Sequence, residues 1–173
     1  MTVLESARLR LRPLTADDAA FILELVNEPA WLQFIGDRNV HTLDDARTYI
    51  AKGPATMYAR HGFGPLAVEL KEGGAPVGIC GLIKRETLPD VDLGYALLAR
   101  FRGRGYASEA AAAVLAHGKP AFGLARVIAL TAPDNTDSIR LLERLGFRYE
   151  RMIAWSPYPE SKLFAHESEA RSG

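Results

Sequence analysis

Apolar residues along this chain recur with two different periods, which predict strands and helices in turn. A period of two, as where Leu9 and Leu11 alternate with arginines, is typical of a half-exposed strand. The polar turn at 71–74 joins two apolar runs and indicates an antiparallel hairpin. Strands are predicted at 8–13, 66–70, 76–83, 92–98 and 126–131, and another begins at Phe147.

Longer stretches carry the helical period and recognisable helix ends. Thr15, Thr42 and Asn135 each precede a helical pattern and have side chains that cap a helix start. Helices are predicted from Thr15 to about Val26, from Thr42 onward, from Tyr106 to His117, and from Asn135 to Gly146 with Ile139, Leu142 and Leu145 inward. The sequence Gly118-Lys119-Pro120 is expected to end the third helix, and two helices are expected between the first strand and the hairpin.

The order of these elements predicts an α+β fold with a mixed sheet. The strand–helix–strand–helix series at 92–145 requires a parallel strand pair, whereas the hairpin at 66–83 requires an antiparallel one. With 173 residues, 48% of them hydrophobic, the chain is long enough for one well-packed domain and short for two. We expect a single domain over 1–173, with its core at 8–166 and a polar tail at 167–173.

The charge balance argues against a polyanionic partner. The formal net charge is +0 and the isoelectric point about 6.9, so no global field favours nucleic acid or an anionic membrane. No run approaches about 18 apolar residues and no signal peptide is recognised, which predicts a soluble cytoplasmic protein. Cys80 is expected to be a buried thiol, and the histidines lack metal-ligand spacing, so no metal site is expected.

A glycine–arginine segment between the strand at 92–98 and the next helix has the composition of a phosphate site. Gly103 and Gly105 allow a positive φ and close approach of a ligand, and the first amides of the following helix lack internal acceptors. Full positive charges stand beside them at Arg100, Arg102 and Arg104. Rossmann and Walker loops are excluded, because the third glycine of the one and the Gly-Lys-Ser/Thr of the other are absent.

Two motifs then carry a family resemblance. The Arg-x-x-Gly-x-Gly spacing from Arg100 to Gly105 resembles the pyrophosphate-binding loop of the GNAT superfamily of acetyl-CoA-dependent N-acetyltransferases. Asn135 and Ser138, on a helix that ends in Gly-Phe, are similar to a second family segment, in the form typical of the RimJ/RimL ribosomal-protein N-terminal acetyltransferases. The resemblance covers residues 8–166. It implies a mostly antiparallel sheet of about six to seven strands flanked by about four helices, with acetyl-CoA entering where two parallel strands splay apart.

The resemblance also implies direct attack of a primary amine on acetyl-CoA in a ternary complex. The family's usual thiolate-protonating tyrosine is Leu142 here, so that role falls to Ser138, whose alternative is a local backbone bond. A backbone amide near Leu97 or Leu98 would hold the oxyanion. Implied contacts of acetyl-CoA are Leu97, Leu98, Arg100, Arg102, Gly103, Arg104, Gly105, Tyr106, Ala107, Asn135 and Ser138, with sheet packing the alternative for Tyr106 and a plain N-cap for Asn135.

Candidates for the acceptor side lie on other segments. Asp92, and Glu86 near the expected cleft entrance, are candidates either to act as a base through water or merely to attract a cationic substrate. For Asp92 the further alternative is a solvated strand carboxylate. Trp31 and Phe34 either wall the acceptor pocket or plug the core, and Tyr95 is a further substrate-binding candidate.

The expected acceptor is the N-terminal α-amine of a ribosomal or other protein. An α-amine with a pKa near 8 is roughly a tenth neutral at pH 7, whereas a lysine with a pKa near 10.4 is far less so, and the former therefore asks less of a base. A small amine, such as an amino acid, polyamine or antibiotic, is the first alternative. A silent acyl-CoA-binding module is the second, permitted by the missing tyrosine. Monomer and homodimer both stay open.

Overall fold

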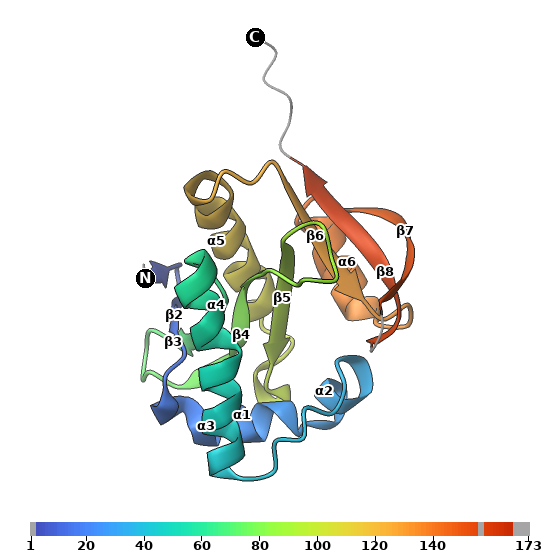
Figure 1. Cartoon of the computed structure of the whole chain (residues 1–173). Coiled ribbons are helices and arrows are strands. Elements are labelled where there is room, and N and C mark those ends of the chain that lie inside the picture. The colour runs from blue at the N-terminus through green and yellow to red at the C-terminus, as the bar shows by residue number, and fades with distance from the viewer. Residues whose placement is uncertain (1–2, 156–157, 168–173) are drawn as a thin grey trace.

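The chain folds around one twisted sheet, which runs through the middle of the computed structural model (Figure 1). The structure describes residues 3–155 and 158–167. Its strands are β1 Leu4–Glu5, β2 Leu9–Pro13, β3 Pro65–Leu70, β4 Pro76–Ile83, β5 Asp92–Leu97, β6 Arg126–Thr131, β7 Arg148–Trp155 and β8 Tyr158–Glu167. They lie in the order β1-β2-β3-β4-β5-β6-β8-β7, and every neighbouring pair is antiparallel except β5 and β6. The predicted mixed, mostly antiparallel fold is confirmed, with eight strands rather than six to seven.

Helices cover both faces of this sheet. They are α1 Ala19–Val26, α2 Pro29–Phe34, α3 Leu43–Lys52, α4 Pro54–His61, α5 Tyr106–Ala121 and α6 Thr136–Arg144, with short 3-10 turns at Ala16–Asp18 and Ala99–Phe101. α1, α2 and α3 bury apolar side chains against one face of the sheet, at Ala67 and Ile79. α5 and α6 pack against the other face, around Cys80 and Leu93. No helix in the described ranges is long and apolar enough to cross a bilayer.

Two of these helices, α2 and α4, were not predicted. They make four helices between β2 and β3, where two were expected. Each begins with a proline, Pro29 or Pro54, whose fixed φ and missing N–H suit the first helical position. With 6 and 8 residues they are too short for the apolar period to show, so the prolines are the signal that would have found them.

The predicted end of the third helix is also wrong. α5 continues through Gly118 to Ala121, with Pro120 inside its last turn. A proline near the end removes only one backbone bond, so the turn survives. Gly118 serves close packing instead, since a Cβ there would come within 2.4 Å of Leu82 Cδ1. The glycine that ends the helix is Gly123, whose φ of 64° is left-handed.

The remaining predicted helix, α6, begins where expected. Asn135 caps it, because its side-chain oxygen accepts a hydrogen bond from the backbone amide of Ser138 at 3.3 Å. Leu142 is buried as predicted, whereas Ile139 is half-buried and Leu141 takes a buried place instead.

The polar tail predicted at 167–173 is wrong at its first residue. Glu167 is the last residue of β8, and its carboxylate accepts a hydrogen bond from Arg126 at 2.7 Å. The rest of that prediction, at 168–173, lies outside the described residues.

The parallel pair, β5 and β6, is joined at one end only. Its register pairs Asp92 with Ile128, and the amide of Ile128 donates to the carbonyl of Val91 at 2.9 Å. Beyond this point the two strands have no register partners, so their carboxyl ends at Leu97 and Thr131 diverge. α5 follows β5 and α6 follows β6, and the starts of both helices therefore lie at the open end of the gap (Figure 1).

Candidate active site

The glycine–arginine loop, residues 99–105, connects the open end of β5 to α5. Gly103 and Gly105 have φ values of 76° and 82°, in the left-handed region where a Cβ costs roughly 1–2 kcal/mol. Gly105 is the N-cap of α5, and it has no side chain with which to cap the helix. The first amides of α5 are therefore open to an oxygen-rich ligand, and the helix dipole favours a negative one. The positive φ predicted at both glycines is observed.

Arg8, which the sequence reasoning overlooked, braces this loop. Its Nε donates to the Glu109 carboxylate at 2.8 Å and its Nη1 to the carbonyl of Arg104 at 2.9 Å. The same guanidinium lies 4.6 Å from the centroid of the Tyr106 ring. Glu109 also accepts from the Ser6 hydroxyl and from the backbone amide of Arg8, at 2.5 and 2.9 Å. The turn between β1 and β2, residues 6–8, thus fixes both the loop backbone and the first turn of α5. Tyr106 is 9% exposed and packs in the core, as its alternative reading predicted.

The three loop arginines lie in different surroundings. Arg100 forms an ion pair with Glu24 of α1, so part of its charge is already compensated. Arg102 donates a hydrogen bond to the carbonyl of Leu97 at 3.0 Å, across the mouth of the gap. Arg102 and Arg104 are exposed, which leaves their charges at the surface of the loop.

The backbone of β5 directs amides into the gap. The amide of Leu98 does not take part, because it donates to the carbonyl of Val77 on β4 at 2.9 Å. Successive residues of a strand direct their amides to opposite sides, so those of Leu97 and Tyr95 point toward β6, where pairing has ended. Of the two amides expected near the thioester, only that of Leu97 faces the gap.

Tyr95 and Ser138 meet across this gap. Their hydroxyl oxygens are 2.5 Å apart, although one residue lies on β5 and the other in the first turn of α6. The backbone amide of Ser138 bonds the Asn135 cap, while its hydroxyl bonds a group from a distant element. Burial raises the pKa of Tyr95 to about 12, which keeps the phenol protonated at neutral pH.

Asp92 is three residues from Tyr95 on the same strand, so its side chain points to the opposite face of the sheet. It is 3% exposed, and the alternative of a solvated carboxylate is therefore wrong. Its Oδ2 lies 3.4 Å from Nε of Arg85, and its Oδ1 has no hydrogen-bond partner among the described residues. Burial raises the pKa of Asp92 to about 6, against the opposing effect of Arg85.

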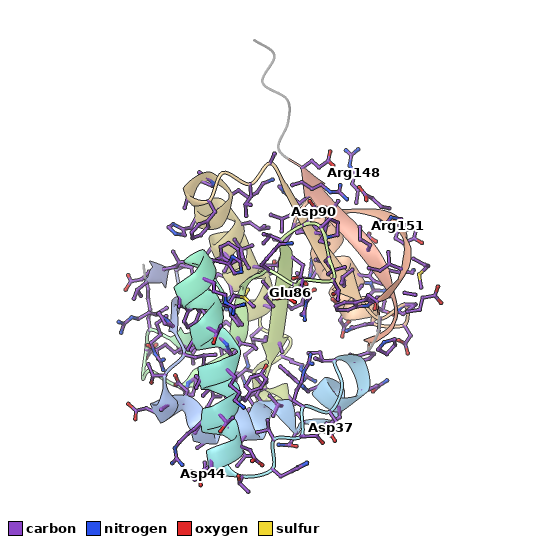
Figure 2. The ribbon with its side chains drawn as sticks, viewed as in Figure 1. Asp37, Asp44, Glu86, Asp90, Arg148 and Arg151 are labelled. Atoms are coloured by element: carbon purple, nitrogen blue, oxygen red, sulfur yellow. The ribbon has the colours of Figure 1, made fainter. Side chains whose placement is uncertain are left out.

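The segment 84–91, between β4 and β5, covers the sheet beside Asp92. Leu88 is buried against Ile128, and the side chain of Asp90 accepts a hydrogen bond from Arg126 at 3.1 Å. Figure 2 shows that Glu86 and Asp90 both come from this segment. Glu86 is exposed, so its carboxylate lies at the surface of the segment that also supplies Arg85.

The two aromatic candidates of α2 differ in burial. Trp31 is 5% exposed and belongs to the core cluster beneath α1 and α3, so it packs in the core. Its indole Nε1 is buried and has no hydrogen-bond partner among the described residues. Phe34 is half-buried at the end of the same helix.

These parts together bring hydrogen-bond donors to the open end of the gap. The loop and the start of α5 carry donors that suit an anion, and the gap is lined by the amides of Leu97 and Tyr95 and by a pair of hydroxyls, with a buried carboxylate on the far face of the sheet. In the described ranges, no three His, Cys, Asp or Glu side chains are grouped to hold a metal ion. A family model described as an acetyltransferase (GNAT) domain matches residues 8–148. The chain belongs to the GNAT acetyltransferase family.

Similar proteins support this assignment. The Bacillus subtilis (strain 168) N-acetyltransferase YoaA is 28% identical over 153 residues, which cover 87% of this chain and 85% of YoaA. An acetyltransferase from Agrobacterium tumefaciens C58 has a TM-score of 0.83 at 26% identity, over 97% and 95% of the two chains. RimL, a ribosomal L7/L12 α-N-protein acetyltransferase solved with coenzyme A, has a TM-score of 0.80 at 19% identity, over 96% and 98%, and so shares the fold. The chain is an acetyl-CoA-dependent N-acetyltransferase.

Proposed function

We propose that this N-acetyltransferase modifies the N-terminal α-amine of a protein, with ribosomal proteins as the expected class. Asp92 carries the proposal, as a buried carboxylate whose Oδ1 has no hydrogen-bond partner within the described part of the chain and whose pKa is about 6. An α-ammonium, with a pKa of about 8, is within about two units of such a base, whereas a lysine at about 10.4 is more than four units away. A base of this strength therefore favours an α-amine.

The loop is proposed to hold the donor. The amides at the start of α5, Ala107 among them, would bind the pyrophosphate of acetyl-CoA together with Gly103, Gly105 and the exposed Arg102 and Arg104. The pantetheine arm would then run along β5 into the gap. There the amides of Leu97 and Tyr95 are oriented to bind it and the thioester carbonyl.

The two faces of β5 would separate the two proton transfers. The amine would approach on the face of Asp92, give its proton to the free oxygen and form the C–N bond. The C–S bond would break with its electron pair on sulfur, and Ser138 on the other face would protonate the thiolate. Residues 92 and 95 are about 10 Å apart along the strand, which leaves room for the reacting carbon between these groups.

One exposed acidic side chain on the segment 84–91 suits a cationic acceptor. Glu86 is exposed on the segment that covers Asp92, where it would attract an ammonium group. Phe34, half-buried at the end of α2, would supply apolar surface on the acceptor side. The fold shared with RimL, whose name records an α-N-protein acetyltransferase, agrees with this acceptor class.

Free-thiol release from acetyl-CoA tests the proposal across a panel of acceptors. The panel holds peptides with free N-termini, the same peptides with a blocked N-terminus and one lysine, and small amines. Turnover confined to free N-termini, with the mass of the product raised by one acetyl group, is expected. Turnover on small amines alone would overturn the protein acceptor, and tight acetyl-CoA binding without turnover would favour a non-catalytic module.

A further inference from the structure

The chemistry proposed for Ser138 lacks one component. A serine hydroxyl is about as weak an acid as water, whose pKa is about 15.7, whereas a free thiol has a pKa of about 8.5. Transfer of a proton from an isolated serine to a thiolate is therefore uphill by about seven pKa units. Ser138 therefore needs a stronger acid that returns a proton to it, or a hydrogen bond that stabilises its oxygen after the proton has left.

The structure places such a group against Ser138. The hydroxyl of Tyr95 lies 2.5 Å from Ser138 Oγ, a distance typical of a strong O–H···O hydrogen bond. The same hydroxyl is 3.4 Å from the backbone carbonyl of Ser138, so it is directed at the first turn of α6. We infer that Tyr95 acts through Ser138 as a positioning and proton-relay residue in thiolate protonation. This inference rests on the role proposed for Ser138.

The relay balances in protons and electrons. As the C–S bond breaks, its electron pair passes to sulfur and the Ser138 hydroxyl proton follows. The Tyr95 hydroxyl proton passes to the Ser138 oxygen, and the resulting phenolate regains a proton from solvent. Asp92 separately holds the proton that the amine has lost.

The surroundings of Tyr95 set its pKa, and therefore how unfavourable the overall proton transfer from Tyr95 to the thiolate is. Its pKa of about 12 is above that of a free phenol but lies about 3.5 units from a thiol, half the gap for serine alone. Burial raises the pKa of Tyr95, the hydrogen bond with Ser138 lowers it, and Cys80, the register partner of Tyr95 on β4, raises it. The helix α5 contributes the apolar Ala110 and Ala111 to the core cluster against which Tyr95 packs.

Kinetics of four proteins test the relay: wild type, Tyr95→Phe, Ser138→Ala and the double variant. Tyr95→Phe is expected to lower kcat about 10- to 100-fold with the KM for acetyl-CoA unchanged. The double variant should be no slower than Ser138→Ala, because both residues act in one step, and Ser138→Thr, which keeps the hydroxyl, should retain most of kcat. Tyr58→Phe removes another buried phenol, on α4, which accepts a hydrogen bond from the Leu14 amide, and should leave kcat unchanged.

A second readout needs no acetyl-CoA. The proton NMR spectrum of the free protein should hold a downfield hydroxyl signal that both Tyr95→Phe and Ser138→Ala remove. Its persistence in Ser138→Ala would contradict the hydrogen bond. Wild-type kcat in Tyr95→Phe, or losses that multiply in the double variant, would overturn the relay alone. Absence of turnover in the wild type with every acceptor would instead overturn the proposed function.

Discussion

Strand β5 contributes to two regions, one formed by consecutive residues and the other by residues from different elements. At its carboxyl end, the glycine–arginine loop and the start of α5 are one continuous stretch, 99–109, whose properties follow largely from local rules for glycine and helix ends. At the proposed reacting centre, Tyr95 meets Ser138 and Asp92 meets Arg85, and the members of the first pair are 43 residues apart. The proposed donor site is thus encoded mainly by local rules, whereas the proposed proton relay is encoded by the pairing of distant elements. Substitutions in the two regions should fail in different ways.

The largest effect is expected for Gly105→Val in the loop. A branched side chain at φ 82° is strained, and its Cβ would lie 3.3 Å from Nη2 of Arg8. The loop backbone must then move off the position that leaves the α5 amides open. We expect calorimetry to show at least about a 100-fold loss of acetyl-CoA affinity, which corresponds to about 2.7 kcal/mol.

Gly123→Val is the matched control for that loss. Gly123 has a φ of 64° and a Cβ added there would meet nothing within 4 Å, but it lies at the opposite end of α5 from the loop. The Gly123→Val variant should lose about as much folding stability as Gly105→Val and should still bind acetyl-CoA. Unchanged affinity in Gly105→Val, or an equal loss in Gly123→Val, would contradict the assignment of the loop.

An intermediate effect on activity is expected for Asp92→Asn, with binding of acetyl-CoA unchanged. The pKa of Asp92 is raised to about 6, so the carboxylate gains a proton as pH falls through that value and can no longer accept one. Loss of the base should lower kcat/KM for the acceptor about 10- to 100-fold at pH 7, with acetyl-CoA affinity unchanged.

The pH profile distinguishes a base from a structural carboxylate. An α-amine alone makes log kcat/KM fall with a slope of one as pH decreases below about 8. In the wild type the slope should reach two below about pH 6, where Asp92 is also protonated. In Asp92→Asn it should stay at one. A slope of two that survives in the variant would assign the second proton to another group.

The smallest effect is expected for Arg8→Ala, which tests the brace behind the loop. Arg8 touches the loop through the Arg104 carbonyl and Glu109, and both contacts are partly exposed, so each contributes modestly. A roughly 3- to 10-fold weaker affinity for acetyl-CoA is expected, about 0.7–1.4 kcal/mol. Arg10→Ala, two residues further along the chain on β2 and paired with Glu69, should bind as the wild type does. Equal affinities in both variants would show that the loop holds its shape without Arg8.

Much of the fold could be predicted because its signals are local. Alternation in β2 and β3, the hairpin turn, and the cap at Asn135 each depend on a few neighbouring residues. The helices α2 and α4 were missed because they are shorter than the window over which helical periodicity shows. The end of α5 was misplaced because Gly118 meets Leu82 of another element, and the sequence carries no mark of that contact.

In the candidate site too, features set by local sequence could be predicted, whereas features set by contacts between distant elements could not. The positive φ of Gly103 and Gly105 follows from residue type, and the structure shows it directly. The brace by Arg8 and the burial of Asp92 under Arg85 depend on which strands become neighbours, so no local pattern could reveal them. The sequence left open whether the amide of Leu97 or that of Leu98 faces the gap. The direction of each amide decides this, and that direction is known only once the register of β4 and β5 is known.

The buried thiol of Cys80 has a practical consequence for the acceptor assay. It is the single cysteine of the chain and is 1% exposed, in the middle of β4. Burial raises its pKa far above that of a free thiol, so hardly any thiolate is present for a disulfide reagent to attack. In the folded protein, the colour developed by such a reagent should therefore report coenzyme A alone. A slow protein-dependent signal without an acceptor would instead measure how often β4 opens.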